Sequence, residues 1–174
     1  LQKIYYSKKL KSIGKCAFLN TKKLTTLTLN QNISRINVDA FKGSKVPLIK
    51  VMNPSLSINF GGYTIPKTTK IQCYGTNTPI YKYARVNGNK VILMISSITL
   101  NTKKVVCKEK TTTVKANLSP SIATNKKVKW FTTNKNIATV DSKGKVKAKK
   151  KGTCYVYCKS TDGSNKTSNK MKKI

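Results

Sequence analysis

The chain has 174 residues, of which 36 are Lys or Arg and only 4 are Asp or Glu, and its formal net charge is +32. This length allows one domain or two small ones, and 38% hydrophobic residues are enough for packed cores. The longest apolar run, Val91 to Ile95, is far shorter than the ~20 residues of a membrane-spanning helix, so no transmembrane segment is expected. The chain starts at Leu1 without a signal-type segment, which indicates a processed protein or a piece of a longer one.

The acidic residues are too few and too scattered for ordinary acid–base catalysis. Such chemistry usually needs His, or paired carboxylates whose environments separate their pKa values. The chain has no His, and its acids lie far apart in the sequence: Asp39, Glu109, Asp141 and Asp162. It also lacks the glycine-rich loop that holds nucleotide phosphates and any pair of metal-ligating residues with two-residue spacing. We therefore expect no enzyme, no cofactor and no metal site.

The first half of the sequence repeats itself. The phrase Ile13–Phe18 (IGKCAF) returns 23 residues later as Ile36–Phe41 (INVDAF), and a third, degraded copy starts at Ile49 and reaches Ile58. An apolar pair precedes the first two phrases at the same offset, namely Ile4 with Tyr6 and Leu27 with Leu29. Each unit reads as a short strand and a turn that buries an Ala-Phe pair. Since one unit cannot cover its own apolar face, the units must stack.

The phrases Leu24-x-x-Leu27-x-Leu29 and Ile-x-x-x-Ala-Phe resemble BspA-type leucine-rich repeats, which occur in surface proteins of anaerobic bacteria. The next stretch resembles the segment that commonly closes such an array: a strand at 69–75, a short helix around Pro79 to Val86 and a last strand at Lys90 to Met94. The resemblance covers about residues 1–95 and implies a short leucine-rich-repeat solenoid. Because about three or more repeats are needed for a stable stack, we expect further repeats before Leu1.

From about Ser96 the sequence changes to short alternating strands separated by polar turns, a pattern typical of a β-sandwich. Trp130 is expected to anchor its core. Alternation places Cys154, Val156 and Cys158 on the inward face, so both cysteines are expected to be small core residues. The predicted strands are 97–100, 111–118, 128–131, 138–140, 145–148 and 154–158, with a turn at 141–144.

Several phrases of this half resemble the bacterial immunoglobulin-like domain, group 2. They are Val128-Lys129-Trp130, Ile137-Ala138-Thr139-Val140-Asp141, Gly144-Lys145-Val146, Gly152-Thr153 and Thr161-Asp162-Gly163. One turn departs from the family, because Lys108-Glu109-Lys110 stands where Gly followed by an acid is common, and this leaves the shape of that turn open. The resemblance covers about residues 96–174 and implies an immunoglobulin-like β-sandwich that serves as a spacer or adhesion module. The whole chain is therefore expected to be mainly β, with domains at 1–95 and 96–174.

The five cysteines do not form a recognisable disulfide framework, and their odd number leaves at least one thiol unpaired within the chain. Cys154 and Cys158 are ~13 Å apart along one predicted strand, so they cannot bond to each other. Whether Cys107 pairs with Cys154 or with Cys158 across the two layers stays open.

Five lysines of the second half are candidate polyanion-binding residues. Lys145, Lys147 and Lys149 alternate with apolar residues, so their ammonium groups should line one outer face at ~6.7 Å intervals. Lys127 and Lys129 flank an inward-facing valine and are candidates to extend this row. Such a row repels itself unless a counter-ion or a polyanion lies beside it, which makes it a plausible binding surface.

Both halves are strongly basic, with 16 cations and 1 acid in residues 1–95 and 20 cations and 3 acids in residues 96–174. The pattern favours a non-catalytic secreted or cell-surface bacterial protein for adhesion. Its basic faces would associate with anionic wall polymers or host glycans, its repeats with a ligand such as a host protein, and the isolated chain would be a monomer. A second reading is a passive spacer of a larger extracellular protein. A nucleic-acid binder is disfavoured, because only two Arg are present and most aromatic residues fall at core positions.

Overall fold

The computed structural model of the protein describes residues 4–60, 64–102, 104–105, 111–169 and 171–173. Within these residues the secondary structure is mainly β, with one short helix, which confirms the predicted class. The chain divides into two compact units, Leu1–Met94 and Ile95–Ile174.

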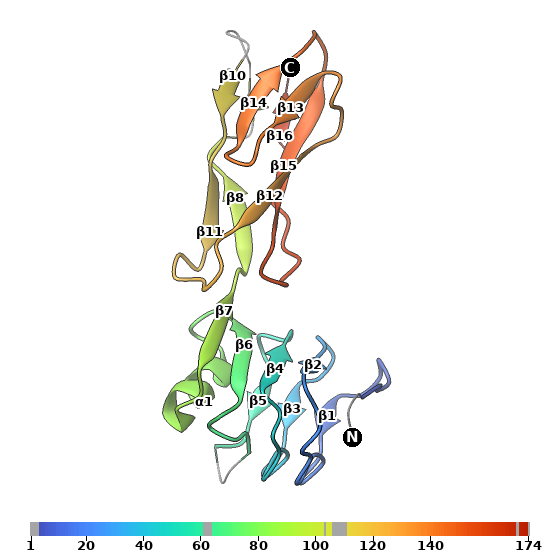
Figure 1. The fold of residues 1–174 in the computed structure, drawn as a ribbon, viewed down its shortest axis with the longest axis vertical. Helices are drawn as coiled ribbons and strands as arrows, with labels where there is room; N and C mark the ends of the chain where they lie inside the picture. The colour runs from blue at the N-terminus through green and yellow to red at the C-terminus, as the bar shows by residue number, and fades with distance from the viewer. Residues whose placement is uncertain (1–3, 61–63, 103, 106–110, 170, 174) are drawn as a thin grey trace. The chain divides into compact units, whose positions relative to one another are not determined.

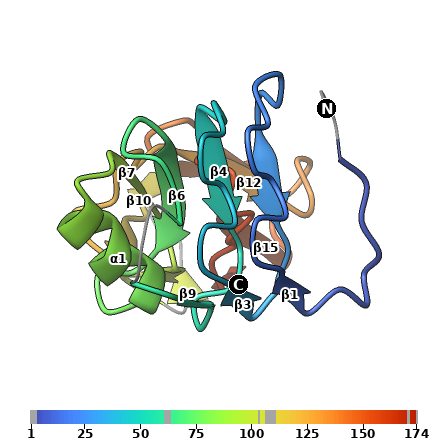
Figure 2. The same cartoon turned by 90° about the horizontal axis from the view of Figure 1, so that it is seen from below.

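Two sheets, each made of parallel strands, form the first unit (Figures 1 and 2). The smaller sheet has the order β1-β3-β5, formed by Ser12–Ile13, Arg35–Ile36 and Ser57–Ile58. The larger sheet has the order β2-β4-β6-β7, formed by Leu27–Leu29, Leu48–Val51, Lys70–Tyr74 and Val91–Met94. In both sheets a strand pairs with its counterpart from the next repeat. Residues that are one sequence repeat apart therefore lie side by side on neighbouring strands.

The core of the first unit consists of apolar residues that recur with the repeat. Ile13, Ile36 and Ile58, one in each strand of the smaller sheet, are all buried. Phe18 and Phe41 are buried as well, and their rings stack with centroids 4.8 Å apart and an interplanar angle of 11°. The phenylalanine of each Ala-Phe pair therefore packs on its copy in the neighbouring repeat, which covers an apolar face that a single repeat would expose.

The turns of the repeat also recur in backbone conformation. Cys16 and Asp39 are one repeat apart and have φ angles of 57° and 56°. Asn20 and Gly43, again one repeat apart, have φ angles of 55° and 65°. Positive φ is uncommon outside Gly, Asn and Asp, so its return at the same offset indicates that successive repeats follow one chain path.

The helix α1 (Pro79–Asn87) starts where the sequence predicts and ends one residue beyond Val86. Its first turn is capped by Thr78, whose side-chain oxygen accepts a hydrogen bond from a backbone N–H at 3.3 Å, and it contains a proline. Gly88 ends the helix in the left-handed conformation, with φ of 78°. The helix packs on the first unit through three buried residues, Ile80, Tyr83 and Ala84.

Three sheets form the second unit. Their strand orders are β11-β8 (Ala116–Ser119, Ser97–Leu100), β10-β14-β13 (Thr111–Thr113, Lys145–Ala148, Ala138–Val140) and β12-β15-β16-β9 (Val128–Thr132, Cys154–Ser160, Met171–Lys173, Lys104–Val105). The strands predicted at 97–100, 138–140 and 145–148 are confirmed with those bounds. The strands predicted at 128–131 and 154–158 are confirmed and run one and two residues further.

One predicted strand is wrong. Residues 111–118 do not form a single strand, because β10 pairs with β14 while β11 pairs with β8 in another sheet. Between them the backbone N–H of Val114 donates to the carbonyl of Gly144 at 2.9 Å, and that of Lys115 donates to the side chain of Asn101 at 2.9 Å. These two residues leave the ladder, and the chain passes from one sheet to the next.

The core of the second unit has two buried clusters, and Trp130 packs against both of them. The predicted inward face of β15 is confirmed, since Cys154, Val156 and Cys158 are buried. Both cysteines are free thiols. Cys107, the third cysteine of this half, lies outside the described residues.

Candidate functional site

Of the five predicted lysines, two lie in β14 and a third directly follows its end. Lys145, Lys147 and Lys149 are exposed, whereas Val146 between the first two is fully buried. Burial thus alternates along the strand as the sequence indicated. The three ammonium groups are available on the solvent side of the sheet.

A hollow of about 390 Å³ lies beside Lys145 and Lys147. The two strands that flank β14 contribute Thr111 and Thr139, and both residues are register partners of Lys147. Figure 1 shows β10, β14 and β13 as adjacent strands. Lys147 thus lies between Thr111 and Thr139 on the neighbouring strands. Its ammonium group and the two threonine hydroxyls are hydrogen-bond donors that suit the oxygens of sulfate, phosphate or carboxylate groups.

The other two predicted lysines belong to a different sheet. Lys129 lies in β12 and Lys127 directly precedes it, and β12 pairs with β15, whereas β14 pairs with β10 and β13. Strand pairing therefore does not join Lys127 and Lys129 to the row on β14. Lys127 instead lines a separate hollow of about 560 Å³ with Thr124, Asn125 and Lys126.

Lys129 has neighbours that the sequence analysis did not select. Its register partner is Lys159 of β15, and two residues further along the ladder Phe131 lies opposite Tyr157. A local signal existed, because an inward-facing Cys154 implies that the odd-numbered residues of β15 face outward. Which residue of β12 lies opposite each of them depends on the register between two strands, and no single segment of sequence contains that information.

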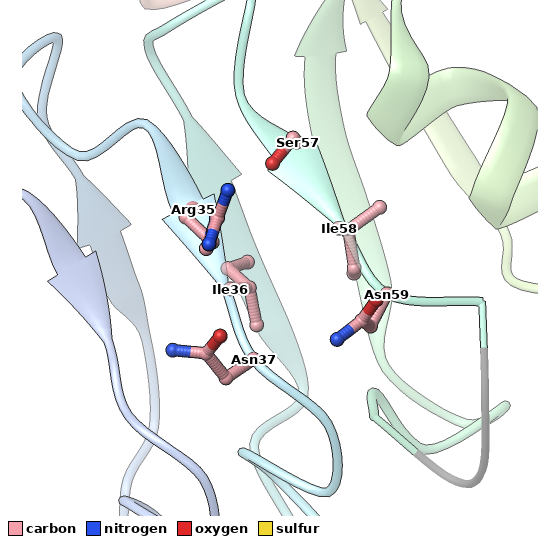
Figure 3. Close-up of a pocket in the computed structure, with 6 residues that line it drawn as sticks. All are labelled: Arg35, Ile36, Asn37, Ser57, Ile58 and Asn59. Carbon is pink, nitrogen blue, oxygen red and sulfur yellow. The ribbon is translucent and has the colours of Figure 1, made fainter.

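A third hollow, of about 360 Å³, lies between β3 and β5 in the first unit (Figure 3). Arg35 and Ser57 are register partners at one end of it, and Asn37 and Asn59 lie at the other end. The side-chain amide of Asn37 donates a hydrogen bond of 2.9 Å to the carbonyl of Ile13, which fixes its orientation. The hollow thus presents a guanidinium, a hydroxyl and two amides on the outer side of the repeats.

The described acidic residues lie in turns or loops. Asp39 has a positive φ in a repeat turn, and the Oδ1 atom of Asp141, which also lines the hollow beside β14, accepts two backbone N–H groups of its own turn at 2.8 Å each. Asp162 accepts hydrogen bonds from Ile95 and Ser164. Glu109 lies outside the described residues. The carboxylates of Asp141 and Asp162 therefore stabilise the local structure of their own segments.

Burial controls the chemistry of two thiols. It raises the pKa of Cys73 to about 12. It also raises the pKa of Cys158, although a hydrogen bond from Ser168 acts in the opposite direction. Because the thiolate is the nucleophilic form, both groups are poor nucleophiles at neutral pH.

Within the described ranges, no three residues of the metal-ligating types His, Cys, Asp and Glu come together in a group that could hold a metal ion. The same part of the chain has no helix with the length and apolar character that crossing a membrane requires. The polar groups that the three hollows present are ammonium, guanidinium, hydroxyl, amide and one carboxylate.

Two family models match this chain. One is described as BspA type Leucine rich repeat region (6 copies) and matches residues 1–105. The other is described as Bacterial Ig-like domain (group 2) and matches residues 95–171. Their order along the chain is the order that the sequence motifs implied.

The chain is also similar to parts of two curated proteins. It is 44% identical over 66 residues to a kappa-carrageenase of Pseudoalteromonas carrageenovora, which is 37% of this chain and 17% of that enzyme. It is 34% identical over 82 residues to an uncharacterised protein of Clostridium acetobutylicum, which is 47% of this chain and 8% of that protein. The matched segments therefore span less than a fifth of either relative.

Proposed function

Because this chain belongs to the BspA type leucine-rich repeat family and carries a bacterial immunoglobulin-like domain of group 2 after its repeats, we propose that it is a non-catalytic binding module of a secreted or cell-surface bacterial protein. Its partner is an anionic polymer, either a wall polymer such as teichoic acid or a host glycan. The module works by adhesion, and it is extracellular.

The strand pairing supports the architecture that this proposal assumes. The parallel ladders of the first unit, each step joining neighbouring repeats, correspond to a short solenoid with β6, α1 and β7 as its closing segment. The three sheets and inward-facing β15 of the second unit correspond to an immunoglobulin-like sandwich. The domain boundary then lies close to residue 95, and the repeats offer the hollow beside Arg35 as a ligand surface.

The observation that carries the proposal is the exposed row of Lys145, Lys147 and Lys149 beside a hollow with two threonine hydroxyls. An anionic polymer with regularly spaced charged groups fits a row of ammonium groups better than a single small anion does, because one chain neutralises several of them. The net charge of +32 adds long-range attraction for the same partner.

The similarity to the kappa-carrageenase supports a role in recognition. The name kappa-carrageenase describes an enzyme that acts on a polysaccharide, and the matched segment is 17% of that enzyme. A segment of this size agrees with a part that accompanies a catalytic domain. We therefore expect the protein that contains this chain to use it for holding a polymer or a surface.

Retention on isolated Gram-positive cell walls tests the proposal. The variant Lys145→Gln/Lys147→Gln/Lys149→Gln should bind about tenfold more weakly than the unchanged chain, because it loses three solvent-exposed charge pairs with phosphate, each of which contributes only about 0.5 kcal/mol. Lys8→Gln/Lys9→Gln/Lys11→Gln is the matched control, since it removes the same charge from exposed positions of the first unit. Walls stripped of teichoic acid should retain all three proteins weakly.

Equal retention of both triple variants would contradict a defined site and favour the passive spacer, whose charge interacts with any polyanion alike. Equal retention on native and stripped walls would remove teichoic acid as the partner. Submicromolar, sequence-selective binding to DNA or RNA at physiological salt would instead favour a nucleic-acid binder.

A further inference from the structure

The outer face of the β12–β15 pair carries a compact group of four side chains, which we call the β12–β15 platform: Lys129, Phe131, Tyr157 and Lys159. The antiparallel register pairs Lys129 with Lys159 and Phe131 with Tyr157. The intervening pair, Trp130 and Cys158, faces the core. Since side chains alternate between the two faces of a sheet, the four platform residues share the opposite, outer face.

The two aromatic rings of the platform stack on each other. The centroids of Phe131 and Tyr157 lie 5.3 Å apart, and the interplanar angle is 16°. Both side chains are partly exposed, and Tyr155, two residues earlier on β15, is 40% exposed. The sheet therefore exposes aromatic carbon together with tyrosine hydroxyls, a combination that favours ligands with both apolar and hydrogen-bonding groups.

Two ammonium groups converge on the same ring. The Nζ atoms of Lys129 and Lys159 lie 5.8 Å and 5.7 Å from the centroid of Phe131. Cation–π attraction holds both groups near the ring. Two like charges directly opposite each other on a sheet nevertheless repel. An anionic group beside both lysines would remove that repulsion, so the platform is complementary to a ligand with a negative charge.

We propose that the β12–β15 platform is a binding site for an anionic polysaccharide. The apolar C–H face of one sugar ring packs on Phe131 and Tyr157, and a sulfate or carboxylate substituent of the polymer lies between Lys129 and Lys159. Tyrosine hydroxyls supply hydrogen bonds to neighbouring sugar hydroxyls. The platform thereby selects a sugar that is charged, and does not only attract negative charge.

A single-stranded nucleic acid fits the platform less well. A nucleic-acid strand is held by several successive bases, each stacked on an aromatic side chain, whereas Phe131 and Tyr157 stack on each other and offer one partly exposed aromatic surface. Base edges are read most often by Arg, and residues 95–174 contain none. The observations therefore favour the polysaccharide, and nucleic acid becomes one outcome of the test.

This inference rests on the proposed function for its anionic partner, but it assigns the sugar contact to a different sheet. The row on β14 offers ammonium and hydroxyl groups without an aromatic ring, and β14 and β12 are not paired. The two sites can therefore be removed independently, with the same change in charge.

Calorimetric titration with dextran sulfate, neutral dextran and oligothymidine tests the platform. Phe131→Leu/Tyr157→Leu keeps the net charge and apolar bulk, and it should weaken dextran sulfate binding by about fivefold. Lys129→Gln/Lys159→Gln should weaken it further and reduce the preference over neutral dextran. Phe131→Tyr/Tyr157→Phe, which keeps both rings but moves the hydroxyl, should bind dextran sulfate more tightly than the leucine variant does.

The control is Lys8→Gln/Lys9→Gln, which removes two charges from exposed positions of the first unit and should lose less affinity for dextran sulfate than the lysine pair of the platform. If both lysine pairs lose the same affinity, or if the leucine variant is folded and binds normally, the platform proposal is wrong. Tighter binding of oligothymidine than of dextran sulfate would also overturn it. If the β14 variant alone loses wall retention, the proposed function stands and only the platform fails. If wall retention is unchanged in every variant, the proposed function fails as well.

Discussion

The backbone N–H of Ile95 donates a hydrogen bond of 2.5 Å to the Oδ2 atom of Asp162, a residue 67 positions further along the chain. The other carboxylate oxygen accepts hydrogen bonds from the N–H group of Ser164 at 3.0 Å and from its hydroxyl at 2.6 Å. Burial acts to raise the pKa of Asp162, but the hydrogen bonds together outweigh it and hold the pKa below its usual value. One carboxylate thus ties the first residue of the second unit to the loop after β15.

The second unit should lose this stabilisation in acid. A carboxyl group with a lowered folded pKa stabilises the fold above its unfolded pKa, and the contribution disappears as the pH falls through the folded pKa. We expect Asp162→Asn to lower the free energy of unfolding by about 1–2 kcal/mol at pH 7. Urea unfolding at pH 7 and well below about pH 4 measures this, and the difference from the unchanged chain should shrink in acid. An equal difference at both pH values would contradict the assignment.

Gly144 should not tolerate a side chain. Its φ is +80°, and an added Cβ would lie 2.3 Å from the carbonyl oxygen of Val114 and 2.9 Å from the ring of Trp130. Gly144→Ala should therefore destabilise the second unit by about 2 kcal/mol or more. Chemical denaturation monitored by the fluorescence of the single tryptophan measures the effect. Ser142→Ala, an exposed change in the same turn, is the control and should shift the midpoint little.

The thiols should differ strongly in reactivity. Cys16 is partly exposed, whereas Cys73, Cys154 and Cys158 are buried, and burial raises the pKa of Cys73 to about 12. A short maleimide treatment of the native protein at pH 8 should therefore modify Cys16 far faster than the three buried residues. Peptide mapping by mass spectrometry resolves each site, and unfolding in urea should make all of them equally reactive. Rapid modification of Cys73 in the native state would contradict the burial of its thiol.

The phenylalanine stack should be a principal source of stability in the first unit. Phe41→Ala removes a fully buried ring that packs on Phe18, so a loss of about 3–5 kcal/mol is expected. Leu19→Ala is the control, because Leu19 is 46% exposed and should cost much less. Thermal unfolding followed by circular dichroism gives both values. Similar losses in the two variants would mean that the stack between repeats contributes little.

Elements with strong local signals were predicted with accurate bounds. The helix α1 combines a capping threonine, an early proline and a glycine beyond its end, and each of these acts within one turn. The strand Lys145–Ala148 follows a turn with Asp141 and Gly144, and its alternation is unambiguous. In contrast, the break after Thr113 was missed. The residues there keep alternating, and the cause of the break is a pair of bonds to distant groups in other parts of the second unit.

The candidate site likewise has features that local sequence predicts and features that depend on distant residues. Exposure of the lysines on β14 follows from the sequence, because the alternation lies within one strand. The convergence of Lys129 and Lys159 on Phe131 does not follow, because it depends on the pairing of β12 with a strand more than one element away. Sequence reasoning selected Lys129 but neither Lys159 nor the aromatic residues beside them.

Hydrogen bonds between neighbouring repeats recur at a constant sequence spacing in the first unit. The N–H of Ser34 donates to the carbonyl of Lys11 at 2.8 Å, and the N–H of Ser57 donates to the carbonyl of Ser34 at the same distance. Duplication or loss of one whole repeat leaves every such donor with an equivalent acceptor, whereas deletion of a single residue in a strand turns its inward side chains outward. Unequal recombination can therefore lengthen or shorten this array in whole steps during evolution without any redesign of its interior.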